Sequence, residues 1–293
     1  MKILLIGANG QLGSDLVRTL TDVDLAPLTH RDVDICEAVG LRETLRRHAP
    51  DVVINTAAYH KVDECETNVE KTFAVNTHGV RNLALACKGQ GCALLHMSTD
   101  YVFGGDARRR TPYAETDPPS PINVYGIAKL AGEHFVRYIL DRYWIVRSQW
   151  LYGVAGASGK GGNFVELMLR LAREGRDIKV VNDQVGSPTH TLDLARKIAQ
   201  LVKTEHYGLY HVTNRGACTW YQFAGKIWNL SGLNPNAEPT TTAAFGAVAT
   251  RPAYSVLDNA ALRTIGLDDM RPWEEALAAY LEQRKQEDSN RGV

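Results

Sequence analysis

Short apolar runs alternate with helical periodicity through the first half of the chain. Residues 3–6, 51–58 and 93–98 have the apolar character of buried strands, and residues 69–89 have the periodicity of a helix. This alternation is typical of units in which a helix connects two parallel strands. The pattern predicts an α/β fold with a central parallel sheet.

Three glycines, Gly7, Gly10 and Gly13, follow the first predicted strand at intervals of three. Gly7 and Gly10 let the backbone turn tightly beside a pyrophosphate, and Gly13 lets the helix that begins near Gln11 pack on the sheet. The free amides of that helix N-terminus suit phosphate oxygens. A glycine turn that binds no nucleotide is the alternative, but its place directly after the first strand favours a dinucleotide. We therefore predict a Rossmann-type, doubly wound parallel sheet.

Beyond about residue 153 the regular alternation gives way to glycine-rich and mixed segments, such as residues 156–162 and 182–188. We predict that residues 1–152 form an NAD(P)-binding domain. Residues 153–293 are expected to form a smaller, mainly substrate-binding region that is interwoven with part of the first domain. The charged stretch at the end of the chain, residues 282–293, is expected to fray.

Composition narrows the class of protein. The chain has 293 residues, 44% of them hydrophobic, and its 33 basic and 33 acidic residues cancel. This length supports a large core, and the charge balance argues against a nucleic-acid or anionic-membrane partner. No signal peptide or membrane-spanning run is visible, and the five cysteines are odd in number and lack metal-type spacing. We expect a cytoplasmic protein with reduced cysteines.

Tyr125 and Lys129 are four positions apart, so a helix would place both on the same face. A phenol with a pKa near ~10 is a poor acid at neutral pH, and a nearby ammonium lowers that pKa. The pair therefore suits proton transfer to a carbonyl, and Lys129 could also bind ribose hydroxyls. A surface tyrosine packed over a lysine stem is the alternative.

Thr99 follows the predicted strand at residues 93–98. Ligands of open α/β sheets bind beyond the carboxyl ends of the strands, so Thr99 is placed to hydrogen-bond a substrate carbonyl beside Tyr125. Its hydroxyl could instead cap the strand end or a turn. The presence of the glycine turn, the threonine and the Tyr–Lys pair in one chain favours catalysis.

These motifs together resemble the extended short-chain dehydrogenase/reductase family. The resemblance rests on the glycine turn, residues 98–103 and residues 125–129, and it extends over nearly the whole chain. It is closest to members that reduce the C4 ketone of dTDP-4-dehydro-L-rhamnose, on segments 123–133, 147–152, 162–164 and 183–189. The resemblance implies the last step of dTDP-L-rhamnose synthesis, with hydride from NADPH or, as a second choice, NADH.

The same resemblance implies roles at the reaction centre. Tyr125 would give a proton to the developing alkoxide, Thr99 would orient the carbonyl oxygen, and Lys129 would hold the nicotinamide ribose while tuning Tyr125. Asp100 and Trp150 would contact the sugar. From the residues alone, Trp150 could be an ordinary core aromatic, and Asp100 could cap the turn after its strand.

Cofactor contacts are implied residue by residue, at the pyrophosphate turn, at an adenine-side pair and after the third strand. They are Gly7, Gly10, Gln11, Leu12, Gly13, Asp34, Ile35, Ala58, Tyr59, His60 and Lys129. Any α/β core could use Ile35 and Ala58, and Asp34 could cap a helix.

Cofactor choice can be argued from charge. The predicted second strand ends within residues 25–29, and His30 and Arg31 follow it, with no carboxylate before Asp32. A carboxylate at that strand end would repel a 2′-phosphate. The sequence therefore favours NADPH, with Arg31 pairing the phosphate. An exposed, unengaged Arg31 is the alternative.

Some members of the family hold magnesium at a dimer contact through glutamates. This chain has Asp15 near the first position and Leu192 where the second is expected. We predict that Asp15 and Asp193 are solvated helix residues, because magnesium demands several well-placed oxygens. We therefore expect no required metal, and a monomer or a metal-free homodimer.

Three residues of the C-terminal region have two interpretations each. Arg251 could present its guanidinium to the nucleotide diphosphate of a dTDP-sugar, or form a structural ion pair. Asn163 and Phe164 could bound the sugar-nucleotide pocket, or begin a helix.

Other functions compete with this prediction. A dehydratase is expected to carry paired acidic residues after the catalytic threonine, whereas Tyr101 follows Asp100. An epimerase is a further rival, and a ketoreductase that gives the talose epimer would need nearly the same residues. A non-catalytic regulatory subunit, as in animal methionine adenosyltransferase, is disfavoured because Thr99, Tyr125 and Lys129 are all present. The stereochemistry at C4 stays open.

Overall fold

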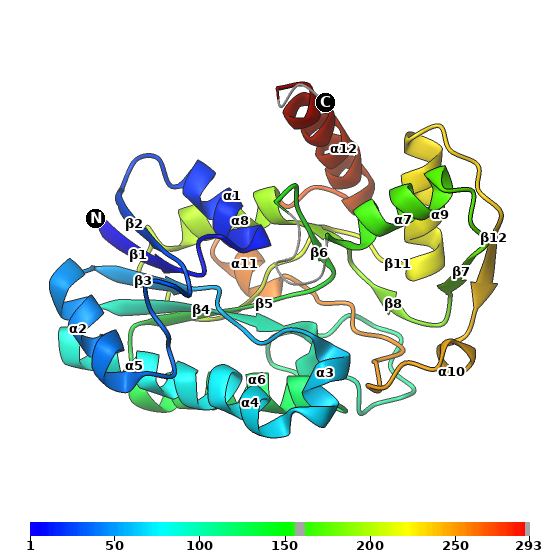
Figure 1. Ribbon diagram of the computed structural model, residues 1–293. Helices are drawn as coiled ribbons and strands as arrows, with labels where there is room; N and C mark the ends of the chain where they lie inside the picture. The colour runs from blue at the N-terminus through cyan, green and yellow to red at the C-terminus, as the bar shows by residue number, and fades with distance from the viewer. Residues whose placement is uncertain (156–161, 291–293) are drawn as a thin grey trace.

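The computed structural model describes residues 1–155 and 162–290 and confirms the predicted Rossmann-type α/β fold (Figure 1). A six-stranded sheet with the order β10-β5-β4-β3-β1-β2 lies at its centre, and all of its neighbouring strands are parallel. Its strands are β1 (Lys2–Ile6), β2 (Asp24–Leu28), β3 (Val52–Asn55), β4 (Ala93–Thr99), β5 (Tyr143–Ser148) and β10 (Gly208–His211). The strand order reverses between β1 and β3, which is where such sheets bind ligands.

Helices cover both faces of this sheet (Figure 1). One layer contains α1 (Gln11–Thr19), α8 (Thr191–Leu201) and α11 (Ala260–Thr264), and the other contains α2 (Ala38–His48), α5 (Val80–Gln90) and α6 (Val124–Ile139). Ile3 and Leu5 pack against the first layer, and Leu4 and Ile6 against the second. Side chains alternate across a strand, so a strand buried on both faces reads as the continuous apolar run seen in the sequence.

The helical segment predicted at residues 69–89 is interrupted. It consists of α4 (Val69–Phe73), a π-helical turn η1 (Ala74–Gly79) and α5, and the short α3 (Val62–Thr67) precedes it. A 3₁₀ turn, η2 (Asp100–Val102), directly follows β4. Turns of the π type often occur at functional sites.

A second core lies beside the sheet in the later part of the chain. Its helices are α7 (Phe164–Arg173), α9 (Trp220–Leu230), α10 (Thr242–Phe245) and α12 (Trp273–Asn290). Its short strands pair as β6 (Leu151–Tyr152) with β9 (Thr189–His190), β7 (Ile178–Val181) with β12 (Ala237–Thr240), and β8 (Val185–Gly186) with β11 (Cys218–Thr219). Tyr152, Phe223, Trp273 and Tyr280 contribute aromatic rings to this core.

The expectation of a fraying C-terminal tail is wrong for residues 282–290, because α12 continues to Asn290, and residues 291–293 lie outside the described residues. Arg18 of α1 pairs with Glu287 at 2.6 Å, and Arg284 pairs with Glu166 of α7 at 2.7 Å. The glycine-rich stretch at residues 156–161 lies outside the described residues. In the described part of the chain, helices are too short or too polar to cross a membrane.

Candidate active site

A cavity of about 2000 Å³ opens beyond the carboxyl ends of the central strands. Pockets for drug-sized ligands typically measure ~300–1,000 Å³, so this cavity has room for a dinucleotide and a second ligand. Of the residues that we predicted from motifs, those that line it are Gly7, Gly10, Gln11, Leu12, Gly13, Asp34, Ile35, Ala58, Tyr59, His60, Thr99, Asp100, Tyr125, Lys129, Trp150, Asn163, Phe164 and Arg251. Arg31 does not line the cavity; it is exposed beside the lining residue His30.

The glycine turn has no room for side chains at two of its positions. Gly7 has a φ of +87°, and a Cβ there would lie 2.5 Å from Thr56 Oγ1. A Cβ on Gly13 would lie 2.1 Å from the Gly7 carbonyl oxygen. Gly10 is the N-cap of α1 and leaves the first turn of that helix without a side-chain cap. The turn therefore directs unshielded amides toward the cavity, as a pyrophosphate site requires.

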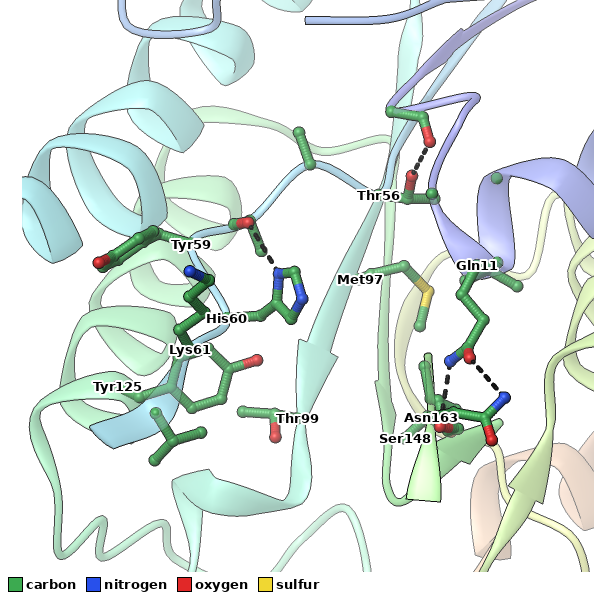
Figure 2. A pocket seen from close by; sticks show the side chains of 18 of the residues that line it. Gln11, Thr56, Tyr59, His60, Lys61, Met97, Thr99, Tyr125, Ser148 and Asn163 are labelled. Atoms are coloured by element: carbon green, nitrogen blue, oxygen red, sulfur yellow. Dashed lines mark hydrogen bonds between the residues drawn. The ribbon is translucent and has the colours of Figure 1, made fainter. Parts of the chain in front are cut away.

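Gln11 connects this turn to the second core (Figure 2). Its Nε2 donates to the Leu151 carbonyl at 3.0 Å, and its Oε1 accepts from Asn163 Nδ2 at 3.3 Å. Asn163 also caps α7, because its Oδ1 accepts from the Glu166 amide. Asn163 thus begins a helix and lines the cavity, which unites its two predicted interpretations.

Tyr125 and Lys129 lie one turn apart near the start of α6. Figure 2 shows Tyr125 beside Thr99, which ends β4. Lys129 is buried; its Nζ donates to the Met97 carbonyl at 2.6 Å and lies 3.4 Å from His96 Nε2. These contacts hold the start of α6 against the end of β4, so the hydroxyls of Thr99 and Tyr125 share one wall of the cavity.

Burial dominates the acidity of these groups. Burial, and then the Asp100 carboxylate, raise the pKa of Tyr125, while a hydrogen bond with Thr99 acts in the opposite direction. Burial lowers the pKa of Lys129 to about 8, and Glu133 opposes it. The net shift of the Tyr125 pKa is therefore upward, whatever lowering the expected effect of Lys129 contributes. A protonated Tyr125 is nevertheless the form that a proton donor needs.

Thr99 and Asp100 form a buried hydroxyl–carboxyl pair. Thr99 Oγ1 donates to Asp100 Oδ1 at 3.0 Å and accepts from the Tyr101 amide at 3.2 Å, so it also caps the turn η2. Burial raises the pKa of Asp100 to about 7, against hydrogen bonds with Ser255 and Thr99. The Thr99 hydrogen is engaged here, so a ketone oxygen would compete with Asp100 for it.

Two further segments line the cavity, one at Asp34 and one at Tyr59. Asp34 lines the cavity while its Oδ1 caps the Cys36 amide at 2.8 Å. Asn76 of η1 holds both the amide and the carbonyl of Tyr59, each at 2.9 Å. The Tyr59 hydroxyl donates to Glu64 at 2.7 Å, which raises the pKa of the phenol to about 12.

Trp150 and Arg251 both lie in the cavity wall with fixed partners. Trp150 has a φ of +47°, a conformation that costs ~1–3 kcal/mol for a bulky residue. Its ring stacks on Trp220 with centroids 3.6 Å apart. The Arg251 guanidinium makes two hydrogen bonds to the Asp63 carboxylate, at 3.0 and 2.8 Å. The structural ion pair considered for Arg251 is therefore present.

Sequence motifs missed four residues that shape this site. His96 and Asn76 hold Lys129 and Tyr59 in place, and Gln149 and Trp220 line the cavity. A single buried polar residue such as His96 or Asn76 has no spacing signal.

The prediction that Asp15 and Asp193 are solvated is wrong, since both are buried. Asp15 accepts from Thr191 Oγ1 at 2.5 Å, and burial raises its pKa. Asp193 accepts two hydrogen bonds from Arg271, at 2.8 and 2.7 Å. Within residues 1–155 and 162–290, no group of three or more His, Cys, Asp or Glu side chains is arranged to hold a metal ion.

The chain is similar to known proteins along nearly its whole length. The dTDP-4-dehydrorhamnose reductase of Streptomyces griseus is 41% identical over 283 residues, which cover 94% of this chain and 91% of that protein. The dTDP-4-keto-6-deoxy-D-glucose reductase of Streptomyces niveus is 40% identical over 278 residues and 94% of each chain.

A solved structure has the same fold at similar identity. The dTDP-4-dehydrorhamnose reductase of Bacillus anthracis, in complex with NADP, matches with a TM-score of 0.91 and 40% identity, over 96% of this chain and 99% of that one. The family model of the RmlD substrate binding domain matches residues 1–286. A glycine turn, Thr99, Tyr125 and Lys129 meet in one cavity of a chain with these relatives, and the chain therefore belongs to the RmlD substrate binding domain family.

Proposed function

We propose that this chain reduces the C4 ketone of dTDP-4-dehydro-L-rhamnose to give dTDP-L-rhamnose, with NADPH as hydride donor. The observation that carries the proposal is the meeting of the glycine turn with Thr99, Tyr125 and Lys129 in one cavity. The names of the relatives from Streptomyces griseus and Bacillus anthracis support the same reaction, and the latter structure contains NADP.

The residues present fit a dinucleotide. The backbone at Gly13 packs so closely on Gly7 that no Cβ fits, and the start of α1 has no side-chain cap. The backbone amides of this turn are therefore free to bind a pyrophosphate. Asp34 and Ile35 would hold the adenosine end, the segment from Ala58 to His60 would line the cofactor, and Lys129 would bind the nicotinamide ribose. When bound, NADPH supplies the hydride.

Tyr125 is the proton donor in this proposal. Its raised pKa keeps the hydroxyl protonated until negative charge develops on the C4 oxygen. The ketone oxygen takes over the Thr99 hydrogen that now goes to Asp100, so two hydroxyls converge on that oxygen. Trp150 and Asp100 contact the sugar, and Arg251 approaches the diphosphate. Of these three residues only Arg251 belongs to residues 153–293, which remain mainly a substrate-binding region in this proposal.

Incubation with dTDP-4-dehydro-L-rhamnose and NADPH tests the reaction. We expect loss of NADPH absorbance that depends on the sugar nucleotide, and a product that NMR identifies as dTDP-L-rhamnose. The talose epimer would show that the opposite face is reduced. If NADPH is consumed with dTDP-4-keto-6-deoxy-D-glucose and not with dTDP-4-dehydro-L-rhamnose, the former replaces the latter as the proposed substrate. If NADPH is oxidised with neither sugar nucleotide, the regulatory subunit becomes the favoured alternative.

Cofactor preference is tested at Arg31. If Arg31 pairs the 2′-phosphate, Arg31→Ala lowers kcat/KM for NADPH but not for NADH. An unchanged ratio of the two values excludes this role for Arg31, which is exposed and outside the cavity lining in this structure.

The proposal extends to a cytoplasmic enzyme that works as a monomer or a metal-free homodimer. Activity and mass that are unchanged in EDTA would support this, and reversible loss of either would contradict it.

A further inference from the structure

Gln149 carries an unused hydrogen-bond donor beside the catalytic residues. It lies between β5 and β6, is 2% exposed, and lines the cavity. Its Oε1 accepts from Ser255 Oγ at 3.3 Å, whereas its Nε2 is buried without a hydrogen-bond partner among the described residues. A buried unpaired donor is costly and rare in native proteins, which suggests that this donor binds a ligand.

Asp100 carries an unused acceptor in the same cavity. Its Oδ1 is taken by Thr99, and its Oδ2 is buried without a hydrogen-bond partner within residues 1–155 and 162–290. The Ser255 hydroxyl is close enough to stabilise the Asp100 carboxylate, but it completes no hydrogen bond to Oδ2. Ser255 therefore interacts with both Asp100 and Gln149, so the two side chains that carry the unused atoms are neighbours in the cavity wall.

The backbone of Gly186 approaches Gln149 and Trp150 closely. A Cβ on Gly186 would lie 2.8 Å from Gln149 Oε1 and 2.6 Å from the Trp150 ring. Oε1 faces Gly186 and accepts from Ser255, so Nε2 is the end of the amide that stays available for a ligand of the cavity that Gln149 lines. Gln149 and Trp150 thus present an amide donor and an apolar ring side by side.

A hydroxyl group is the natural ligand for such a pair, because one hydroxyl both accepts from an amide and donates to a carboxylate. The proposed substrate narrows the choice. Thr99 and Tyr125 hold the C4 oxygen, and Asp100 directly follows Thr99. The ring carbons next to C4 are C3, which carries a hydroxyl, and C5, which carries a methyl group.

We propose that Gln149 and Asp100 together bind the C3 hydroxyl of the sugar, and that Gln149 determines specificity for that hydroxyl. The inference rests on the proposed function. In this arrangement the polar Gln149 contacts the sugar on the C3 side of C4, and the apolar Trp150 contacts it on the C5 side. Sites built to bind a hydroxyl discriminate strongly against analogues that lack it, because their polar groups are then left unpaired.

The test compares the parent 4-dehydro sugar nucleotide with its 3-deoxy and 2-deoxy analogues in wild type and Gln149→Met. Methionine keeps the length of the side chain and removes the donor. We expect wild type to prefer the parent over the 3-deoxy analogue in kcat/KM, and Gln149→Met to lose roughly tenfold of that preference. The preference over the 2-deoxy analogue stays unchanged.

Gln184→Met is the matched control. Gln184 is equally buried, but both ends of its amide are paired, with Trp220 Nε1 at 3.2 Å and Thr242 Oγ1 at 3.0 Å. We expect the control to lower Tm without changing the preference for the C3 hydroxyl. Gln149→Met removes one unpaired donor and only one hydrogen bond, from Ser255 at 3.3 Å, so its Tm is expected to fall less than that of the control.

The inference would be overturned if Gln149→Met lowered kcat/KM equally for the parent and the 3-deoxy substrate. It would also be overturned if the variant lost the preference over the 2-deoxy analogue and kept the preference over the 3-deoxy analogue. In both cases wild-type turnover of the parent substrate would leave the proposed function standing. A wild-type enzyme that does not turn over the parent substrate would overturn the proposed function, and this inference with it.

Discussion

Tyr125 is the proton donor of the proposed reaction, and its burial keeps the phenol protonated at neutral pH. Tyr125→Phe removes only the hydroxyl, so we expect kcat to fall by about 10²–10⁴-fold while NADPH still binds. Steady-state NADPH oxidation and a fluorescence titration with NADPH measure the two quantities. Retained turnover would show that another group protonates the product.

Asp100 gives a pH-dependent contribution to stability. Burial raises its pKa to about 7, so folding favours the protonated carboxyl. That contribution is complete below the ordinary carboxyl pKa and is lost as pH rises through about 7. Asp100→Asn has no titrating carboxyl at this position. As pH rises from about 4 to about 8, we therefore expect the free energy of unfolding of the variant to increase relative to that of wild type, by at most roughly 4 kcal/mol.

Urea unfolding of both proteins at several pH values measures this difference. The buried histidines His190 and His211, whose pKa values burial lowers, titrate in both proteins and cancel in the comparison. Parallel curves across this range would mean that Asp100 is ionised in the folded protein.

At the residue scale, the sequence predicted the groups that belong to motifs. Thr99, Tyr125 and Lys129 do line one cavity. The polarity of a position did not predict its exposure, because the buried Asp15 and Asp193 find partners more than 75 positions away in the chain. Long-range pairs of this kind leave no mark on local spacing.

The turn between β1 and α1 is the element on which cofactor binding depends. Gly13→Ala would place a methyl group 2.1 Å from the Gly7 carbonyl oxygen. We expect a loss of about 1–3 kcal/mol in unfolding free energy and a marked weakening of NADPH binding, because the helix must move away from the strand. Thermal unfolding and a binding titration measure these effects.

Gly89→Ala in α5 is the control, since a Cβ at Gly89 meets nothing within 4 Å. A helical Gly→Ala change without strain is expected to stabilise by about 0.4–1 kcal/mol and to leave NADPH binding unchanged. Equal behaviour of the two variants would contradict the close approach at Gly13.

At the element scale, continuous apolar runs predicted strands well, whereas the segment predicted as one helix at residues 69–89 is interrupted. Strands β1, β3 and β4 follow from continuous apolar runs. The edge strand β10 joins the sheet from the second half of the chain, and its four residues, Gly208 to His211, form no continuous apolar run like that of β3. The charged end of α12 resembled a tail because its anchors, Arg18 and Glu166, lie far away in the chain.

On the scale of the whole molecule, the two parts of the chain meet around the cavity. Asp63 of α3 holds Arg251 from the C-terminal region and also accepts from the Ala249 amide at 2.9 Å. The ion pair is partly exposed, so its own contribution to stability is expected to be at most ~1 kcal/mol. Arg251 therefore has its main effect through the substrate in the proposed function.

Arg251→Gln and Asp63→Asn separate these two roles. We expect Arg251→Gln to raise KM for the sugar nucleotide by about tenfold with little change in kcat, because it removes a charge-assisted contact to the diphosphate. Asp63→Asn breaks the same ion pair and keeps the guanidinium, so its KM should change less. Equal increases in the two variants would assign Arg251 a structural role alone.

The stacked rings of Trp150 and Trp220 also provide an intrinsic spectroscopic probe of the cavity. Two indoles with centroids 3.6 Å apart and planes 12° apart behave as one coupled chromophore. Their electronic transitions mix, and near-ultraviolet circular dichroism and tryptophan emission report that coupling directly. Any molecule that settles against Trp150 or separates the pair changes the spectrum, so occupancy of the sugar end of the cavity can be followed without a label and without turnover.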